Sequence, residues 1–409
     1  MEALIIDWLS LLVRWLHLIT GVAWIGASFY FVWLDNNLQT PPDWKKDKGI
    51  GGDLWAFHGG GIYEVAKYVS SPKIMPSHLH WFKWEAYSTF ITGSLLLIIV
   101  YYLRADLYLV GDNSIINTPI KSVLASLAFL ASGVFIYEVL VRKLAANKGK
   151  IFIGCLISVI ILACWVATEI FSSRAAYLHV GALMASIMVS NVFFGIIPAQ
   201  KRFILAIESG GEKNTTEMGF AKLRSVHNNY FTLPVLFCMI SNHYSFLYGH
   251  PYNWQILVFI IAVTAYARHF FNLRHRGIIK PHILIIAASL TFALFAAMAW
   301  QITVQKNAVT NKTEASNAVI TSTNSEEVTQ IKNNAQALLT THCTICHSNT
   351  PTYAGFNAPP AGLVFENIQQ LKNIKDKAIP AIESKYMPLA NLTQMSDEER
   401  TLLVQALKR

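Results

Sequence analysis

Apolar runs of about 20 residues recur along the first three quarters of the chain, and they limit the fold more than any other feature. A helix of that length, rising 1.5 Å per residue, crosses a hydrocarbon core of about 30 Å. We expect spanning helices at roughly residues 8–34, 84–104, 121–142, 151–172, 175–198, 225–248, 254–273 and 281–304. The sequence therefore predicts an all-α fold whose main part, residues 1–304, is an eight-helix transmembrane bundle.

Basic residues are distributed unequally between the two sides of this bundle. The first, third, fifth and seventh loops hold most of them, whereas the opposite loops hold Arg104, Lys121 and Arg174. Because cytoplasmic loops carry the excess of Lys and Arg, both termini are expected in the periplasm of a bacterial inner membrane. The same clustering accounts for the net charge of +9 without nucleic acid, so membrane lipid is the expected partner and nucleic acid is not.

The composition changes abruptly after Trp300. Residues 305–328 are rich in Asn, Thr, Ser and Lys and lack apolar periodicity, which predicts a flexible tether. Residues 329–409 are expected to form a small soluble domain. Its last helix has a clear start, because Ser396 and Glu399 have the spacing of a capping box.

Cys343-Thr344-Ile345-Cys346-His347 is the most specific motif in the chain. Two cysteines at this spacing can form thioethers to both vinyl groups of one haem, and the adjacent histidine then ligates the iron. A zinc half-site would need a second ligand pair, which this domain lacks. The C-terminal domain is therefore predicted to be a class I-like cytochrome c domain with one covalent haem c.

The sixth iron ligand is expected in a loop before the last helix. Met387 in Tyr386-Met387-Pro388 suits this role, because proline stiffens the loop and a thioether raises the reduction potential. Met395 is the alternative. It directly precedes the helix cap, where a packing role is more usual. Met387 is therefore the preferred axial ligand.

Histidines inside the spans are a further feature, because ionisable groups at membrane depth are costly and usually functional. His17, His179 and His243 lie in the periplasmic half of the expected topology. His17, Gly21 and Trp24 share one helical face, where the glycine would admit a planar group or another helix. This stretch resembles the opening helix of HemJ-type protoporphyrinogen oxidases, whose corresponding histidine binds haem b. The resemblance makes His17 a candidate haem b ligand, with His179 or His243 opposite; the alternative is a hydrogen bond from His17 to a neighbouring helix.

Two polar stretches at membrane depth carry another resemblance. They are His179 through Asn191 to Gln200, and His227-Asn228-Asn229-Tyr230 followed by Ser241-Asn242-His243-Tyr244. Together with the first helix and the haem motif, they resemble the membrane-bound, cytochrome c-linked urate oxidases (urate hydroxylases of the PuuD type), over essentially the whole chain. The resemblance implies an oxidoreductase of purine catabolism that converts urate to 5-hydroxyisourate. Water would supply the oxygen, and electrons would pass through the chain's own haem c to a cytochrome c or terminal oxidase.

Urate at neutral pH is a planar monoanion, and its recognition requires amides, an aromatic face and a cation. Asn228, Asn229, Tyr230 and Arg268 offer such groups near the cytoplasmic face, and His227 is a candidate general base. The alternative is that Asn228 and Asn229 cap the start of the sixth helix. Two other functions stay open: a quinol-oxidising or electron-carrying haem b unit, and a haem-synthesis oxidase, for which a fused haem c has no evident use.

Overall fold

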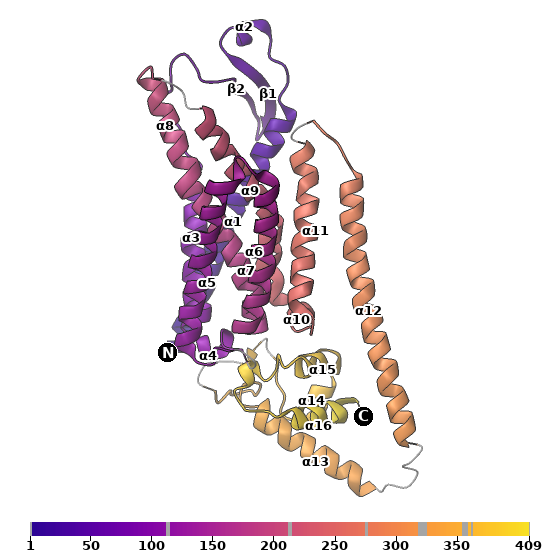
Figure 1. The fold of residues 1–409 in the computed structure, drawn as a ribbon. Coiled ribbons are helices and arrows are strands. Elements are labelled where there is room, and N and C mark those ends of the chain that lie inside the picture. The colour runs from indigo at the N-terminus through magenta and orange to yellow at the C-terminus, as the bar shows by residue number, and fades with distance from the viewer. Residues whose placement is uncertain are drawn as a thin grey trace.

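The computed structural model describes residues 2–111, 115–211, 215–274, 277–317, 325–353, 359–360 and 363–408. Figure 1 shows a long bundle of helices with a small helical domain at one end. The long bundle elements are α1 (Glu2–Asn37), α3 (Trp84–Leu96) with η1 (Leu97–Tyr102), α5 (Pro119–Leu140) with η2 (Val141–Ala145), α6 (Gly149–Ile170), α7 (Ser173–Ser190) running through η3 (Asn191–Ile196) into α8 (Ile197–Glu208), α9 (Thr215–Ile240), α11 (Asn253–Arg274) and α12 (His282–Asn317). Short helical turns α4 (Ala105–Tyr108), η4 (Ser241–His243) and α10 (Ser245–Tyr248) lie between them.

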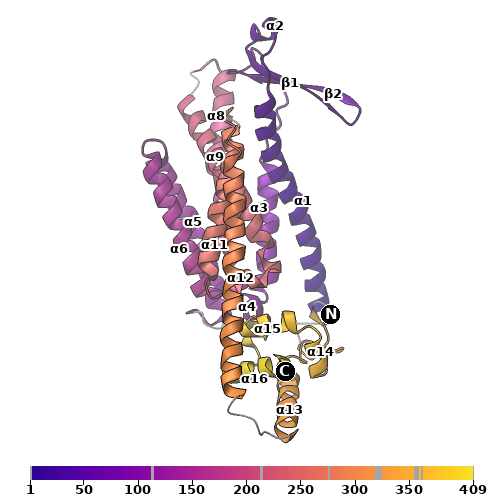
Figure 2. The ribbon, with the colours of Figure 1, turned by 90° about the vertical axis from the view of Figure 1, so that its right-hand side faces the viewer.

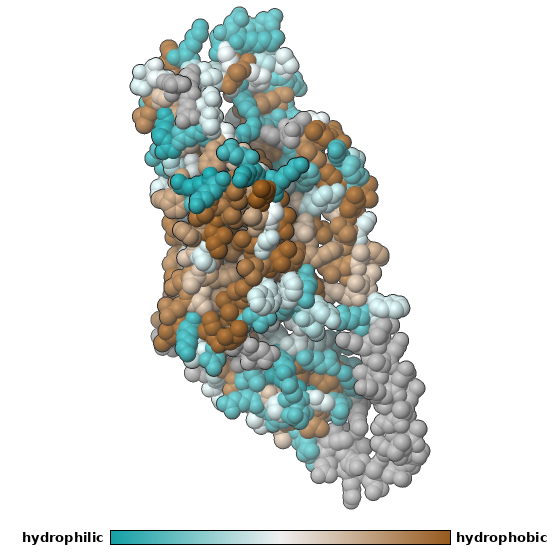
Figure 3. Space-filling view, viewed as in Figure 1, coloured by the Kyte–Doolittle hydropathy of each residue, from teal (hydrophilic) through white to brown (hydrophobic). Residues whose placement is uncertain are grey.

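Seven of the described helical segments are long and apolar enough to cross a membrane. The eighth expected span is α9, whose 26 residues give a length of about 39 Å. It is more polar than the others, but it lies inside the bundle, packed against α7 and α11. On the face that Figure 3 shows, a broad apolar belt lies between two hydrophilic ends. The protein is thus a multi-pass helical membrane protein.

The centre of the bundle is α7, most of whose side chains are buried. It packs against α5, α6 and α9, and small residues allow this close approach. A Cβ atom at Gly181, for example, would lie 2.5 Å from the Cβ of Cys238 on α9. By contrast α1 lies at the edge, where it packs mainly against α3.

The first loop contains structure that the sequence analysis did not predict. After the short helix α2 (Asp43–Lys46), β1 (Ile50–His58) and β2 (Gly61–Tyr68) pair as an antiparallel hairpin. The buried ammonium of Lys45 donates to the carboxylates of Asp53 and Glu64, which ties α2 to both strands. This hairpin marks the end of the bundle opposite the C-terminal domain (Figure 2).

The N-terminus and the C-terminal domain lie at the same end of the bundle (Figure 1, Figure 2). The C-terminal domain consists of α13 (Ser325–His342), α14 (Ile368–Lys372), α15 (Lys375–Glu383), η6 (Leu389–Asn391) and α16 (Asp397–Lys408). Its core forms where α13 meets α16, with Leu339 and Leu403 fully buried. An even number of crossings is what places both parts on one side.

The local structure of residues 305–328 differs from the flexible tether that we predicted. The helix α12 continues to Asn317, and α13 begins at Ser325, so much of the segment that we interpreted as irregular is helical. Residues 318–324 of it lie outside the described ranges. The capping box before α16 is confirmed: the Ser396 N–H donates to Glu399 Oε2 (2.7 Å) and the Glu399 N–H donates to Ser396 Oγ (3.2 Å). The first of these bonds holds the pKa of the Glu399 carboxyl below its usual value.

Candidate functional site

The His227-Asn228-Asn229-Tyr230 string lies in the middle of α9, not at its start. The helix begins at Thr215, so the alternative that the two asparagines cap it is wrong. Successive residues of an α-helix point about 100° apart. Four consecutive side chains therefore spread around the helix, and each meets a different neighbour.

His227 faces α5 and α6, and Asn228 faces α7 and η3. The hydroxyl of Tyr137 lies 2.8 Å from His227 Nδ1, and the ring of Phe152 stacks on the imidazole at 4.8 Å between centroids. Asn228 Oδ1 accepts from Asn191 Nδ2 (2.8 Å), while Asn228 Nδ2 donates to the Met188 carbonyl (3.0 Å). The Asn228 amide thus has a protein partner at each of its ends.

A buried ion pair completes this side of α9. The guanidinium of Arg224, 1% exposed, donates to both carboxylate oxygens of Glu138 (2.8 and 2.9 Å) and to Asn191 Oδ1 (3.1 Å). Only its Nε lacks a partner among the described residues. A Cβ atom at Gly195 would lie 2.3 Å from Arg224 Cδ, so glycine there makes room for the arginine. Charge and hydrogen bonds are therefore largely satisfied on this side.

Asn229 and Tyr230 face α1 and α11. Asn229 Oδ1 accepts a 3.0 Å hydrogen bond from Ser28 on α1. The Tyr230 hydroxyl lies 2.6 Å from His269 Nδ1 on α11, and the two rings stack at 6.0 Å. Arg268 is the neighbour of His269 in sequence, so this second cluster involves α1, α9 and α11.

Arg268 is the exceptional residue of the second cluster. It is 2% exposed, and its guanidinium lies over the ring of Phe29 at 4.8 Å and near that of Phe271 at 5.9 Å. Neither Nε nor Nη2 has a hydrogen-bond partner among the described residues, and no described carboxylate pairs with the charge. Buried charges are ordinarily paired. An unpaired guanidinium on an aromatic face is the arrangement expected of a site that receives an anion.

The five residues that we proposed as one urate site are thus divided between two sides of α9. Asn229, Tyr230 and Arg268 come together, whereas His227 and Asn228 belong to the Arg224 network. Sequence reasoning missed Ser28, Phe29 and His269, which complete the second cluster. The position of His269 next to Arg268 was the one signal that could have included it.

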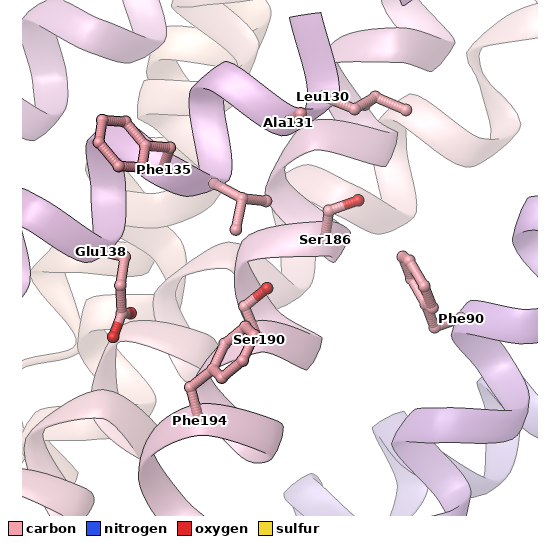
Figure 4. Close-up of a pocket in the computed structure, with 9 residues that line it drawn as sticks. Phe90, Leu130, Ala131, Phe135, Glu138, Ser186, Ser190 and Phe194 are labelled. Atoms are coloured by element: carbon pink, nitrogen blue, oxygen red, sulfur yellow. The ribbon is translucent and has the colours of Figure 1, made fainter. Parts of the chain in front are cut away.

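A cleft of about 510 Å³ lies between α3, α5 and α7 (Figure 4). Its walls are mainly apolar, and Phe90, Phe135 and Phe194 on its rim are 44%, 69% and 56% exposed on the outer surface of the bundle. The polar groups in it are Ser186, Ser190 and Glu138, the last of which is paired with Arg224. Such a cleft suits an acyl chain and not a planar anion.

In the predicted haem motif, His347 is held by the backbone of a later segment. His347 Nδ1 lies 3.1 Å from the Leu363 carbonyl, which fixes the ring and leaves Nε2 for iron. Burial lowers the pKa of His347, which favours the neutral imidazole that a ligand must be. Among the described residues no three His, Cys, Asp or Glu side chains form a metal site. A haem needs none, because the porphyrin supplies four of the iron ligands.

The two methionines of this domain have different surroundings. Met395 is 2% exposed in the domain core, and its backbone N–H and carbonyl both bond to the Asn391 side chain. Met387 is half-buried in the loop between α15 and η6. Buried Arg400 holds that loop, donating to the carbonyls of Ile382 (3.2 Å) and Met387. The packing role expected for Met395 matches its surroundings, and Met387 stays the predicted axial ligand.

His17 and His179 are both hydrogen-bonded within the bundle. His17 Nδ1 lies 2.9 Å from Thr92 Oγ1 on α3, so the alternative of a bond to a neighbouring helix describes it correctly. For His179, Nε2 lies 2.8 Å from Ser126 Oγ and Nδ1 lies 2.8 Å from the Ala175 carbonyl. Both nitrogens of His179 are engaged, and this arrangement does not fit an iron ligand. The Thr92 bond of His17 uses Nδ1 and not Nε2, so His17 stays the candidate for a haem b ligand.

The remaining residues of the candidate haem b site are less constrained. His243 is exposed in η4 at the end of the bundle. No described atom lies within 4 Å of a Cβ built on Gly21, so of the two expected neighbours, a planar group or another helix, no described helix occupies this place. The close contact lies across the interface instead, where a Cβ at Gly93 would be 3.0 Å from His17 Cε1.

The membrane part of the chain matches one known family. A family model described as urate oxidase, N-terminal, matches residues 3–299. No curated protein and no solved structure matches the chain. The matched region contains both sides of α9 and Arg268, and it ends before the haem motif. The chain therefore belongs to the urate oxidase N-terminal family.

Proposed function

We propose that this protein is a membrane urate hydroxylase that converts urate to 5-hydroxyisourate and passes the electrons to its own haem c. The observation that carries the proposal is the buried guanidinium of Arg268, whose Nε and Nη2 have no described hydrogen-bond partner, in a chain of the urate oxidase N-terminal family. The family supports urate as substrate. The unpaired cation supports the place where a urate anion would bind.

The Arg268 cluster has the groups that urate recognition needs. Nε and Nη2 form one edge of the guanidinium, and a fork of two parallel N–H donors matches a pair of adjacent acceptors on a planar anion. Phe29 supplies an aromatic face, and Asn229 supplies an amide whose Nδ2 is not used by its bond to Ser28. Bound urate would neutralise the buried charge, which makes binding favourable.

The reaction consumes one urate and one water and releases 5-hydroxyisourate, two protons and two electrons. We propose His269 as the general base, in place of His227, because it adjoins Arg268 and is oriented by the Tyr230 hydroxyl. An imidazole is suited to accept a proton near neutral pH. His227 lies on the other side of α9, where Tyr137 and Phe152 hold it.

We propose that Cys343 and Cys346 hold the haem c covalently, with His347 and Met387 as axial ligands. The bound haem would exchange single electrons with a cytochrome c or terminal oxidase of the respiratory chain. The basic residues of the loops support an orientation in a bacterial inner membrane with the hairpin end in the cytoplasm and the haem domain in the periplasm. Urate would then be oxidised near one face and its electrons delivered at the other.

The distance between the proposed urate site and the haem domain supports a further cofactor between them. Fifteen residues of α11 separate Arg268 from Asn253, which corresponds to about 22 Å along the helix. We propose His17 as a haem b ligand at intermediate depth, because its Nε2 is not used by the bond to Thr92. A pyridine haemochrome spectrum of the purified protein tests this. His17→Ala should remove the b-type signal and leave the c-type signal unchanged.

The proposed reaction is tested by the origin of the product oxygen. Turnover in isotopically labelled water should place the label in 5-hydroxyisourate, without stoichiometric hydrogen peroxide. Label from dioxygen, or peroxide equal to product, would contradict the proposal. Haem c reduction that depended on quinol and ignored urate would favour the electron-carrier alternative instead.

A further inference from the structure

The haem domain contacts the membrane bundle through the loop that carries Met387. Tyr386 lies directly before this methionine, and its ring meets that of Tyr248 at 5.6 Å between centroids, with 65° between the planes. Tyr386 is partly buried against the hydrophobic core of the bundle, not that of its own domain. The side chain therefore belongs to the membrane domain by packing and to the haem domain by sequence.

Two neighbouring contacts hold the same face. The Tyr353 hydroxyl lies 3.5 Å from Asp106 Oδ2 on α4. The turn η6, which follows Met387, lies next to α4 as well. Figure 1 and Figure 2 show the haem domain next to the α4 end of the bundle. The contacts come from segments that follow the haem-attachment motif and flank Met387.

The loop between these contacts is rigid. Arg400, 5% exposed, donates to the carbonyls of Ile382 and Met387 and, at 2.9 Å, to Asn391 Oδ1. Three points of attachment to one buried side chain fix the loop on both sides of Tyr386. Movement of Tyr386 relative to Met387 is thereby restricted.

The bundle side of the contact is equally well held. Tyr248 is 1% exposed in α10, and Tyr177 packs against it at 6.3 Å. The Tyr177 hydroxyl donates to the Asn253 carbonyl at 2.6 Å, which connects α7 to the start of α11. The Tyr248–Tyr386 contact thus joins two preorganised surfaces.

We propose that the Tyr248–Tyr386 contact docks the haem domain in the position in which it receives electrons from the bundle. Tyr386 is then a positioning residue for electron transfer, because electron tunnelling falls steeply with distance and with loss of packed atoms between donor and acceptor. The inference rests on the proposed haem c and urate oxidation. It implies that the external electron acceptor uses another face of the haem domain.

The first test compares rates of haem c reduction by urate in anaerobic rapid mixing. Tyr386→Ala and Tyr248→Ala should each slow this step at least tenfold, whereas Tyr386→Phe and Tyr248→Phe should keep it. Reduction by ascorbate, which reaches the haem from solvent, should be unchanged in all four. Tyr63→Ala, in the hairpin at the far end, is the matched control. Wild-type rates in both alanine variants would overturn the proposal.

A second readout does not depend on urate. Cysteines replacing Tyr248 and Tyr386 in the holoprotein should be joined in high yield by a short bismaleimide. A protease site inserted after Asn317 then reports the link, because the two fragments stay together on a denaturing gel. The pair Tyr63→Cys and Tyr386→Cys should not be joined. If urate fails to reduce even wild-type haem, the proposed function falls, and the absence of cross-linking would separately refute the docking.

Discussion

The two sides of α9 both contain a buried arginine, and the two arginines differ in what surrounds them. Arg224 has a carboxylate partner in Glu138 and an amide partner in Asn191. Arg268 has aromatic rings around it and no described acidic partner. The charge on the first side is therefore paired within the protein, whereas the charge on the second side has no described counter-charge.

The different surroundings of Arg224 and Arg268 indicate how a structural polar network inside a membrane can be distinguished from a binding site. Polarity alone marks both sides of α9 equally, since each contains His, Asn and Arg side chains. Satisfaction of the hydrogen-bond donors distinguishes them. Two buried N–H donors without acceptors destabilise the folded protein by several kcal/mol, so their presence indicates a functional role.

Loss of Arg268 should have the largest effect on activity. Arg268→Gln should reduce kcat/KM for urate by at least about 100-fold, equivalent to roughly 2.7 kcal/mol of lost transition-state stabilisation. The folded protein should be no less stable without urate, because an uncompensated buried charge is removed. Steady-state kinetics and thermal unfolding in detergent measure the two quantities. Arg274→Gln, an exposed arginine at the end of the same helix, is the control.

Loss of Arg224 should have the opposite signature. Arg224→Gln leaves Glu138 without its buried partner, and we expect about 2–3 kcal/mol of destabilisation, because removing one member of a buried pair is costly. The partly exposed Glu138 keeps Arg142 at 2.6 Å, which limits the loss. Glu138→Gln combined with Arg224→Gln should recover part of it. Unchanged stability together with lost urate binding would mean that the two sides have been assigned the wrong way round.

The two asparagines provide a smaller and sharper comparison, since they are identical and adjacent. Asn228→Ala removes an amide bonded at both ends, and should cost about 1–2 kcal/mol of stability with little change in KM. Asn229→Ala should raise KM for urate several-fold with little loss of stability. Kinetics and unfolding of the two variants side by side give the answer. A higher KM in Asn228→Ala alone would contradict a structural role for Asn228 and a urate-binding role for Asn229.

The sequence was most informative where the chemistry is local. The CTICH motif and the Ser396–Glu399 cap each lie within a few residues, so both can be recognised from their spacing in the sequence. The spans were also predictable, because the apolar runs have the length that a membrane requires. The hairpin β1–β2 was missed, although Gly59 and Gly60 lie between two runs rich in aromatic and β-branched residues, which is a hairpin signal.

The candidate site depended on packing that spacing does not reveal. His227 to Tyr230 are adjacent in sequence and point to four neighbours, so only the arrangement of helices separates them. His179 was a reasonable haem ligand until Ser126 and the Ala175 carbonyl were seen to use both nitrogens. Arg268 was selected for its charge, and its role in urate binding stays a prediction. Its lack of a described partner is a property of the folded bundle alone.

We propose above that electrons from urate reach the haem held by Cys343 and Cys346. This proposal is tested most directly by adding urate to the oxidised, purified protein without oxygen and recording the haem c absorption spectrum. We expect urate to reduce haem c in the wild type and almost none of it in Arg268→Gln, although ascorbate reduces both. A haem c that stays oxidised with urate, or one reduced equally in Arg268→Gln, would contradict the account.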